Sequence, residues 1–409
     1  MADVSPLAPA RFPDLPPIAG VQLAAAHCGI RYQGRTDLMV ALLAPGTAIA
    51  GVFTKSLTAG APVDWCRKAL KGGKARALVV NSGNSNTFTG RAGRRVVEAT
   101  ARAMAQIAGC RTHEVFISST GVIGEPPPAE KIIAALPAAA AAARADGWNE
   151  AARAIMTTDT FPKGATRNAR IGGVAVTISG FAKGSGMIAP DMATMLAYVF
   201  TDASVPARVL QTLLTAGNER SFNSITVDGD TSTSDTVLLC ATGQARHRRI
   251  ASANDAALKD FRSKLDEVLV DLAQQIVRDG EGAEKFVTIE VAGAASDVAA
   301  RKVGLAIGNS PLVKTAIAAG DANWGRIVMA VGKAGEKADR DRLTISIGGV
   351  KIAAKGGPVP GYDEGPVARH MAGRDIRIAV DLGIGKGRWT VWSCDLTHRY
   401  IDINGSYRS

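Results

Sequence analysis

Apolar positions along the chain follow two alternating patterns, which predict interleaved helices and strands. The clearest helical pattern spans residues 257–279, where apolar side chains recur every three or four positions, namely Phe261, Leu265, Val268, Leu269, Leu272 and Ile276. Similar patterns predict helices over residues 91–108, 129–145 and 206–220. Short apolar runs predict strands at residues 48–54, 77–81, 115–118, 174–179, 195–200, 236–239, 286–291, 343–347, 376–380 and 389–392.

This interleaving favours an α/β class in which helices cover layered sheets, although the pattern does not fix the order of the strands. With 409 residues, the chain is long enough for a sizeable core and for two domains or two closely packed halves. Residues 1–17 include four prolines before residue 17 and no apolar segment. They predict a mobile N-terminal arm and no secretory signal.

The composition is that of a globular protein, with 46% hydrophobic and 21% charged residues, and no apolar stretch approaches the length of a membrane span. The net charge is +11, and only residues 246–249 concentrate basic side chains. A nucleic-acid patch and a solvated loop both fit that cluster. Because aromatic residues for base stacking are scarce, we favour the loop and expect no nucleic-acid or membrane partner.

Cysteine and histidine usage excludes several classes of protein. The five cysteines are odd in number and scattered without a CxxC motif, which favours reduced thiols in the cytoplasm. The sequence contains no HExxH or GxSxG motif, so those metalloprotease and serine-hydrolase patterns are absent. Residues 223–235 suit a hydrogen-bonded loop or a cation site, but they lack the spacing of a calcium-binding EF-hand loop, and we predict no metal.

The segment 183–201 joins a glycine-rich turn and a proline to an apolar run that follows Ala193 and Thr194. If the chain is cut before Thr194, this threonine gains a free α-amine of pKa about 8 beside its own hydroxyl. One cut would then create both a nucleophile and its base. The alternative is a buried strand that starts with a polar residue, which is common.

Two further clusters combine hydroxyl groups with other polar groups. After the predicted strand 115–118, the Thr120 hydroxyl and the Gly121 amide suit an oxyanion, although an ordinary turn explains the same residues. Residues 157–163 bring hydroxyls, a carboxylate and a lysine together. That group suits either a zwitterionic ligand or a capped turn.

Taken together, the segments of the whole chain resemble the glutamate N-acetyltransferase family, also called ornithine acetyltransferases, of the arginine pathway. The resemblance covers nearly the full length, and its motifs occur in the family's order. They are residues 50–54, 81–86, 119–124, 156–160, 183–187, 192–195, 221–223, 226–230, 278–282 and 403–409.

The resemblance implies a fold shared with self-processing aminopeptidases of the DmpA type, in which two mixed sheets lie between layers of helices. It also implies self-cleavage between Ala193 and Thr194. The fragments 1–193 and 194–409 would stay intertwined, and the family usually assembles two copies of each.

The mechanism implied by the resemblance is a ping-pong acetyl transfer without a bound cofactor. Thr194 takes the acetyl group of N-acetylornithine as an ester, with its own α-amine as the base, and then passes it to glutamate. Thr120 and Gly121 would stabilise the oxyanion. The family's substrate contacts correspond to Thr158, Lys183, Thr194, Glu281, Asn404 and Ser409.

Among these contacts, Lys183 suits a substrate α-carboxylate and Glu281 suits the ornithine side-chain ammonium. The choice of Thr158 over Thr157 stays open by one residue. The last residue is Ser409, where many relatives have threonine, and the hydroxyl is retained.

Three alternative hypotheses also make the protein an enzyme. The first is a bifunctional form that also acetylates glutamate from acetyl-coenzyme A. The second is a relative devoted to a secondary metabolite, and the third is an amidohydrolase or aminopeptidase with the same nucleophile. A fourth reading is an uncleaved structural or binding protein.

Overall fold

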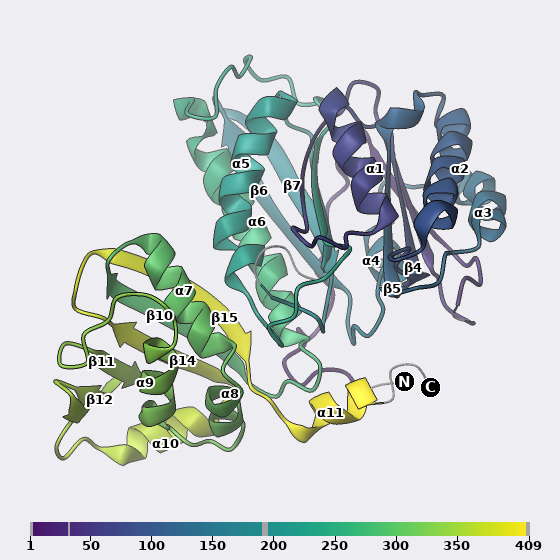
Figure 1. Ribbon diagram of the computed structural model, residues 1–409. Helices are drawn as coiled ribbons and strands as arrows, with labels where there is room; N and C mark the ends of the chain where they lie inside the picture. Colours follow the sequence, from purple (N-terminus) through teal and green to yellow (C-terminus); the bar gives the residue numbers. More distant parts are fainter. Residues whose placement is uncertain (1–2, 32, 190–194, 406–409) are drawn as a thin grey trace.

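The computed structural model describes residues 3–31, 33–189 and 195–405. Figure 1 shows a larger part, in which two sheets stand between two groups of helices, and a smaller part built around a third sheet. The last helix, α11 (His398–Gly405), leaves the smaller part and lies near the chain's N-terminal segment.

The first sheet has the strand order β1 (Val21–Ala26), β2 (Leu38–Leu43), β4 (Ala77–Asn84) and β5 (Val115–Val122), with only β4 and β5 parallel among these described strands. Helices α2 (Gly90–Ala108) and α3 (Ala129–Ala141) pack on its outer face. Along β4, Ala77 and Val79 face these helices while Leu78 and Val80 face the second sheet. The period-two alternation of a strand thus supplies two cores at once.

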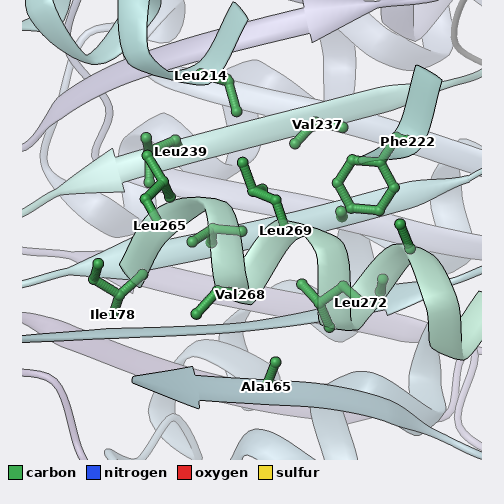
Figure 2. Close-up of a cluster of buried hydrophobic side chains, with 14 of the residues drawn as sticks. Ala165, Ile178, Leu214, Phe222, Val237, Leu239, Leu265, Val268, Leu269 and Leu272 are labelled. Carbon is green, nitrogen blue, oxygen red and sulfur yellow. The ribbon is translucent and has the colours of Figure 1, made fainter. Parts of the chain in front are cut away.

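The second sheet has the order β3 (Ala48–Phe53), β9 (Thr236–Ala241), β8 (Leu196–Thr201), β7 (Val174–Lys183) and β6 (Lys163–Ile171). Its outer face is covered by α5 (Ala207–Arg220) and α6 (Lys259–Arg278). Figure 2 shows Leu265, Val268, Leu269 and Leu272 of α6 directed at this sheet. The apolar spacing of residues 257–279 is therefore the face that α6 buries.

The two sheets pack face to face around large side chains. Tyr198 and Phe200 of β8 point into this layer, and α4 (Trp148–Ala154) inserts Trp148 beside them, with 5.8 Å between the Trp148 and Phe200 rings. Helix α1 (Ala61–Ala69) closes one end, where the Cys66 thiol donates to the backbone carbonyl of Ile117 in β5.

The third sheet has the order β13 (Gly357–Pro358), β12 (Val350–Ala354), β11 (Thr344–Ile347), β14 (Asp375–Asp381), β10 (Phe286–Ala294) and β15 (Gly387–Cys394). Its own core includes residues from α7 (Asp297–Gly308), α8 (Pro311–Ala318), α9 (Trp324–Gly332) and α10 (Glu364–Ala372). In the part of the chain that the structure describes, no helix combines the length and apolarity needed to cross a membrane.

The expected α/β class with two mixed sheets between helices is confirmed in the larger part. The third sheet was not expected as a separate body, although four of its strands follow the predicted runs at 286–291, 343–347, 376–380 and 389–392. The predicted division at residue 193 falls between β7 and β8, which are neighbours in one sheet. Both halves of the chain therefore share the second sheet.

The N-terminal segment contrasts with the mobile arm expected from its prolines. Leu7 and Leu15 are buried, the Ser5 amide donates to Thr160 Oγ1 at 2.9 Å, and the Ser5 hydroxyl donates to the Arg278 carbonyl at 2.6 Å. Proline suits an extended chain running over a surface, and the few apolar residues between the prolines fix it there.

Candidate active site

Three strand ends of the second sheet meet at one edge. Lys183, the last residue of β7, pairs with Leu196 at the start of β8, and Leu196 pairs with Thr236 at the start of β9. Because β7 is antiparallel to β8 and β8 is parallel to β9, the end of β7 and the starts of β8 and β9 lie together. Ala193 and Thr194 lie outside the described residues, and Met195 is the described residue immediately before β8.

A cavity of about 500 Å³ opens at this edge and collects residues from distant segments. Its lining consists of Ser85, Thr120, Gly121, Val122, Ile123, Thr157, Thr158, Lys183, Gly186, Met187, Ser232, Thr233, Ser234, Glu281 and Asn404. Every described residue predicted as a site residue is among them. Both predicted halves contribute, since Lys183 belongs to 1–193 and Glu281 to 194–409.

Lys183 is a buried ammonium group with few partners. Its Nζ donates to Thr120 Oγ1 at 3.1 Å, and among the described residues it forms no ion pair with a carboxylate. Burial lowers the pKa of Lys183, against the opposing attraction of Asp159. The group is therefore ready to bind an anion that enters the cavity.

The Thr120-Gly121 pair comes from β5 and lines the cavity beside Lys183. Gly121 has φ +127°, and a Cβ there would lie 2.3 Å from the Gly83 carbonyl oxygen on β4. Only glycine fits this position. Its positive φ also departs from the extended conformation that is regular for a strand such as β5. The predicted oxyanion role for the two residues stays a prediction.

Glu281 faces the same cavity, and Asn404 and Gly186 hold it in place. The Asn404 amide donates to Glu281 Oε2 at 2.8 Å, and the Glu281 backbone amide donates to the Ser185 carbonyl at 2.9 Å. A Cβ on Gly186 would lie 2.3 Å from Glu281 Oε2, so glycine is what lets the carboxylate approach this loop. The cavity lining thus includes the ammonium group of Lys183 and the carboxylate of Glu281.

The segment 157–163 divides its polar groups between the cavity and the interior. Thr157 and Thr158 both line the cavity, and Thr158 Oγ1 lies 2.7 Å from Ser185 Oγ. The Asp159 carboxylate turns inward instead, accepting from the Gly184 amide at 2.6 Å. Of the residues in this segment that suggested a site for a zwitterionic ligand, only the threonines Thr157 and Thr158 line the cavity.

Lys163 closes a fully buried network with two carboxylates. Its Nζ lies 2.7 Å from Asp159 Oδ1 and 2.6 Å from Asp279 Oδ2. Burial opposes the charge of Lys163, but the two carboxylates hold its pKa above the usual value. Burial raises the pKa of Asp279 to about 6 despite this partner. Because Asp279 follows α6, the network ties the end of α6 to the turn that carries Thr158.

The loop 223–235 is a hydrogen-bonded loop in its first half. Asp228 accepts from the amides of Met187 and Ile188 at 2.5 and 2.9 Å, and from the Asp230 amide at 3.1 Å. These contacts occupy the carboxylate that suggested a cation site. They also fix the segment that runs from the cavity wall toward residue 189.

Sequence reasoning missed the second half of that loop. Ser232, Thr233 and Ser234 line the cavity, and Asp235 lies beneath them, where its Oδ1 accepts from the Met195 amide at 2.8 Å. The available signal was a run of hydroxyl residues ending in an aspartate directly before a strand. Ser409, another predicted contact, lies outside the described residues.

The family model and two similar proteins match this chain over nearly its whole length. The family model described as the ArgJ family matches residues 22–409. The Arginine biosynthesis bifunctional protein ArgJ of Gluconobacter oxydans is 61% identical over 406 residues, which cover 99% of this chain and 96% of that protein. The protein of the same name from Brucella suis is 57% identical over 411 residues, which cover 100% of both chains.

Solved structures give similar matches over part of the chain. A crystal structure of Arginine biosynthesis bifunctional protein argJ from Bacillus halodurans is 40% identical, with a TM-score of 0.49, and covers 51% of this chain and 98% of that chain. The ornithine acetyltransferase of Mycobacterium tuberculosis, solved in complex with ornithine, is 36% identical with a TM-score of 0.39. It covers 42% of this chain and 92% of that chain.

Proposed function

Because the chain belongs to the ArgJ family, it is an acetyltransferase of arginine biosynthesis, and we propose that it passes the acetyl group of N-acetylornithine to glutamate through an ester on Thr194. The observation that carries the proposal is the cavity at the end of β7. There the Lys183 ammonium and the Glu281 carboxylate line one space beside the Thr120-Gly121 pair.

The first step is maturation of the chain. The Thr194 hydroxyl attacks the Ala193 carbonyl carbon, the bond from that carbon to the Thr194 nitrogen breaks, and an ester replaces it. Water then hydrolyses the ester. The products are a carboxylate on Ala193 and a threonine with both a free hydroxyl and a free α-amine.

The second step forms the acetyl-enzyme. The Thr194 hydroxyl oxygen attacks the acetyl carbon of N-acetylornithine while the α-amine takes the hydroxyl proton. The Thr120 hydroxyl and the Gly121 amide donate to the oxyanion of the tetrahedral intermediate. The amide C–N bond then breaks, the proton passes to the leaving nitrogen, and ornithine departs with its α-amine free.

The third step repeats the chemistry in reverse with glutamate. Its α-amine attacks the ester carbonyl, the bond to Thr194 breaks, and the Thr194 oxygen recovers a proton. The product is N-acetylglutamate. The site must exclude water while the ester exists, because hydrolysis would release acetate instead.

Charge complementarity supports this choice of substrates. N-acetylornithine carries an α-carboxylate, which suits Lys183, and a side-chain ammonium, which suits the Glu281 carboxylate that Asn404 holds. Thr158 and Ser409 supply hydroxyl contacts in this proposal. With its nitrogen acetylated, the substrate has no α-ammonium group to be repelled by Lys183.

The proposed function extends to a second acetyl donor, to the assembly of the fragments and to the cellular location. Acetyl-coenzyme A is proposed as a second acetyl donor for glutamate, because the similar proteins of Gluconobacter oxydans and Brucella suis are named bifunctional. The two fragments stay associated as two copies of each. The cytoplasmic location expected from the scattered cysteines also stays a prediction.

A denaturing intact-mass spectrum of freshly purified protein tests the nucleophile. We expect two fragments that divide between Ala193 and Thr194 in the wild type and in Thr212→Ala, a matched exposed control on α5. We expect one full-length chain in Thr194→Ala. Uncut wild-type protein would overturn the mechanism, since it would lack both the base and the free nucleophile.

Acetyl transfer is then measured on the cut protein with N-acetylornithine and glutamate. We expect N-acetylglutamate and ornithine in equal amounts, and an acetyl adduct on the 194–409 fragment when glutamate is omitted. Acetate in place of N-acetylglutamate would favour the amidohydrolase alternative. A parallel assay with acetyl-coenzyme A as the donor tests the bifunctional form.

A further inference from the structure

The mouth of the cavity carries apolar side chains that solvent reaches. Ile123 and Met187 line the cavity and are still 40% and 39% exposed, so they mark its mouth. Phe88 is 87% exposed and adjoins Ile123, because the Gly124 amide donates to the Thr87 carbonyl at 3.0 Å. Exposed apolar side chains that adjoin one cavity form a patch on which a ligand can bury surface.

The turn that carries Phe88 is held in an unfavourable backbone conformation. Asn86 has φ +54° and Phe88 has φ +56°, in the left-handed region that non-glycine residues rarely adopt. The Asn86 side-chain amide donates to the Gly93 carbonyl at 3.0 Å, and the Thr89 hydroxyl donates to Asn86 Oδ1 at 2.7 Å. Such a conformation persists only where its surroundings hold it. These contacts therefore fix the position of Phe88 relative to the start of α2.

Helix α2 begins with three arginines that have no partners. Arg91, Arg94 and Arg95 are exposed, and among the described residues none of them forms an ion pair or a side-chain hydrogen bond. Residues 85–97 contain no aspartate or glutamate. Cations are unfavourable near the first turn of a helix, where the backbone dipole is positive, so helix stability does not account for this cluster. The three guanidinium groups are available to an anionic ligand.

The cavity and the arginines lie on one short stretch of chain. Ser85 lines the cavity, Phe88 follows three residues later and Arg91 six residues later. At about 3.5 Å per residue, the α-carbons of Ser85 and Arg91 are at most about 20 Å apart. Thr87 Oγ1 lies 3.1 Å from Oγ1 of the cavity residue Thr233, which keeps the stretch at the mouth. A ligand that extends outward here meets apolar contacts first and cations next.

We propose that the cavity mouth and the start of α2 bind the part of acetyl-coenzyme A that stays outside the cavity. Phe88 and Ile123 contact its extended, uncharged arm. Its phosphates contact three guanidinium groups, those of Arg91, Arg94 and Arg95. The order of these groups along the protein matches the order along the ligand, in which a thioester is followed by an uncharged arm and then by phosphates.

This inference rests on the proposed function, because it takes acetyl-coenzyme A as a donor for the same acetyl-enzyme. In that step the C–S bond of the thioester breaks, the acetyl carbon bonds to the Thr194 oxygen, and the thiol leaves with the hydroxyl proton. N-acetylornithine has no phosphate and no long arm. The arginines should therefore affect one donor and not the other.

The test replaces the three arginines by alanine together, in Arg91→Ala/Arg94→Ala/Arg95→Ala. Alanine keeps the helix, and the triple variant should raise KM for acetyl-coenzyme A about tenfold, because each exposed ionic contact contributes little and three act together. The same KM should rise with salt concentration in the wild type. S-acetylpantetheine, which has the arm without the phosphates, is the second donor, and N-acetylornithine is the third.

A matched variant removes the same net charge at another place. It is Lys68→Ala/Lys71→Ala/Lys74→Ala, in which three exposed lysines at the end of α1 and just after it are replaced. The opposite end of α1 is the one near the cavity, where the Gly60 amide donates to the Thr233 carbonyl at 2.8 Å. Intact mass of each preparation shows that the chain has folded and cut itself.

Each outcome supports or overturns the proposal. A higher KM for acetyl-coenzyme A alone, in the arginine variant alone, supports it. Equal losses with S-acetylpantetheine, or equal losses in the lysine variant, overturn it, because the phosphates would then not be bound at α2. A wild type that uses N-acetylornithine but not acetyl-coenzyme A also overturns it and leaves the transfer from N-acetylornithine intact. A wild type that uses none of the three donors would overturn the proposed function as well.

Discussion

Two buried lysines stand at the same end of neighbouring strands and meet opposite surroundings. Lys163 opens β6 and contacts the carboxylates of Asp159 and Asp279 at 2.7 and 2.6 Å. Lys183 closes β7, and its Nζ contacts the hydroxyl of Thr120 without a carboxylate at ion-pair distance among the described residues. The pKa of Lys163 is raised by its partners, whereas burial lowers that of Lys183.

This difference in partners distinguishes a buried lysine that stabilises the fold from one that is available to bind a ligand. A buried charge whose partners are complete has nothing left to offer a substrate. A buried charge with an incomplete set of partners destabilises the empty protein, and it can recover that cost when an anion binds. We therefore assign Lys163 to the structure and Lys183 to the substrate, and substitutions can break this assignment.

Lys163→Met should have the largest effect, and that effect should be on stability. It leaves Asp159 and Asp279 buried without their cation, which costs about 3–5 kcal/mol. Urea unfolding is measured in the Thr194→Ala background, so that each sample is a single chain. Lys302→Met, which removes an exposed ion pair with Glu336, is the control and should cost at most about 1 kcal/mol. Equal losses in the two variants would contradict a structural role for the network.

Lys183→Met should leave stability unchanged or raise it, because no carboxylate loses its partner. Its effect should fall on catalysis, with kcat/KM for N-acetylornithine about a hundredfold lower, as expected for the loss of a desolvated partner of a substrate carboxylate. Steady-state rates are measured on the cut protein, and urea unfolding is measured in the Thr194→Ala background. A large loss of stability with nearly normal kcat/KM would place Lys183 in the same class as Lys163.

The sequence predicted which residues gather at the site better than how they are paired. Lys183, Glu281 and Thr120 line one cavity as expected from the family resemblance. Their segments are far apart in the chain, so hydrophobic spacing alone could not bring them together. Whether a lysine finds two carboxylates or one hydroxyl depends on long-range contacts, such as that between Lys163 and Asp279 across 116 positions.

Several of the elements that were missed have identifiable physical reasons. The helices at 61–69, 148–154 and 311–318 are short, with nine residues or fewer, and carry too few turns for a clear period of 3.6 residues. Strand β2 reads Leu-Met-Val-Ala-Leu-Leu, which is apolar on both faces because it lies between two cores. Such a run does not distinguish a strand from a buried helix.

Glu281→Gln tests the opposite charge of the cavity with a smaller expected effect. The amide keeps the shape and an oxygen for Asn404 but loses the attraction for the ornithine ammonium, so KM for N-acetylornithine should rise about tenfold. Self-cleavage, followed by intact mass, should stay nearly normal, because the Ala193–Thr194 bond carries no ammonium. Equal impairment of cleavage and of substrate binding would remove this role from Glu281.

The smallest expected effect is a pH dependence of KM for N-acetylornithine, which reports on the charge of Lys183 in the unsubstituted protein. Because burial lowers the pKa of Lys183, its charge is lost as the pH rises through a value below the ordinary 10.5. The folded protein then binds fewer protons than the unfolded chain, so this group's contribution to stability rises with pH while substrate binding weakens. KM for N-acetylornithine should therefore begin to rise below pH 10.5 and increase severalfold as the pH approaches that value. Lys183→Arg keeps its charge over that range, and its KM should stay flat. If the variant's KM rises as steeply as that of the wild type, another group, such as the ornithine ammonium itself, controls the alkaline limb.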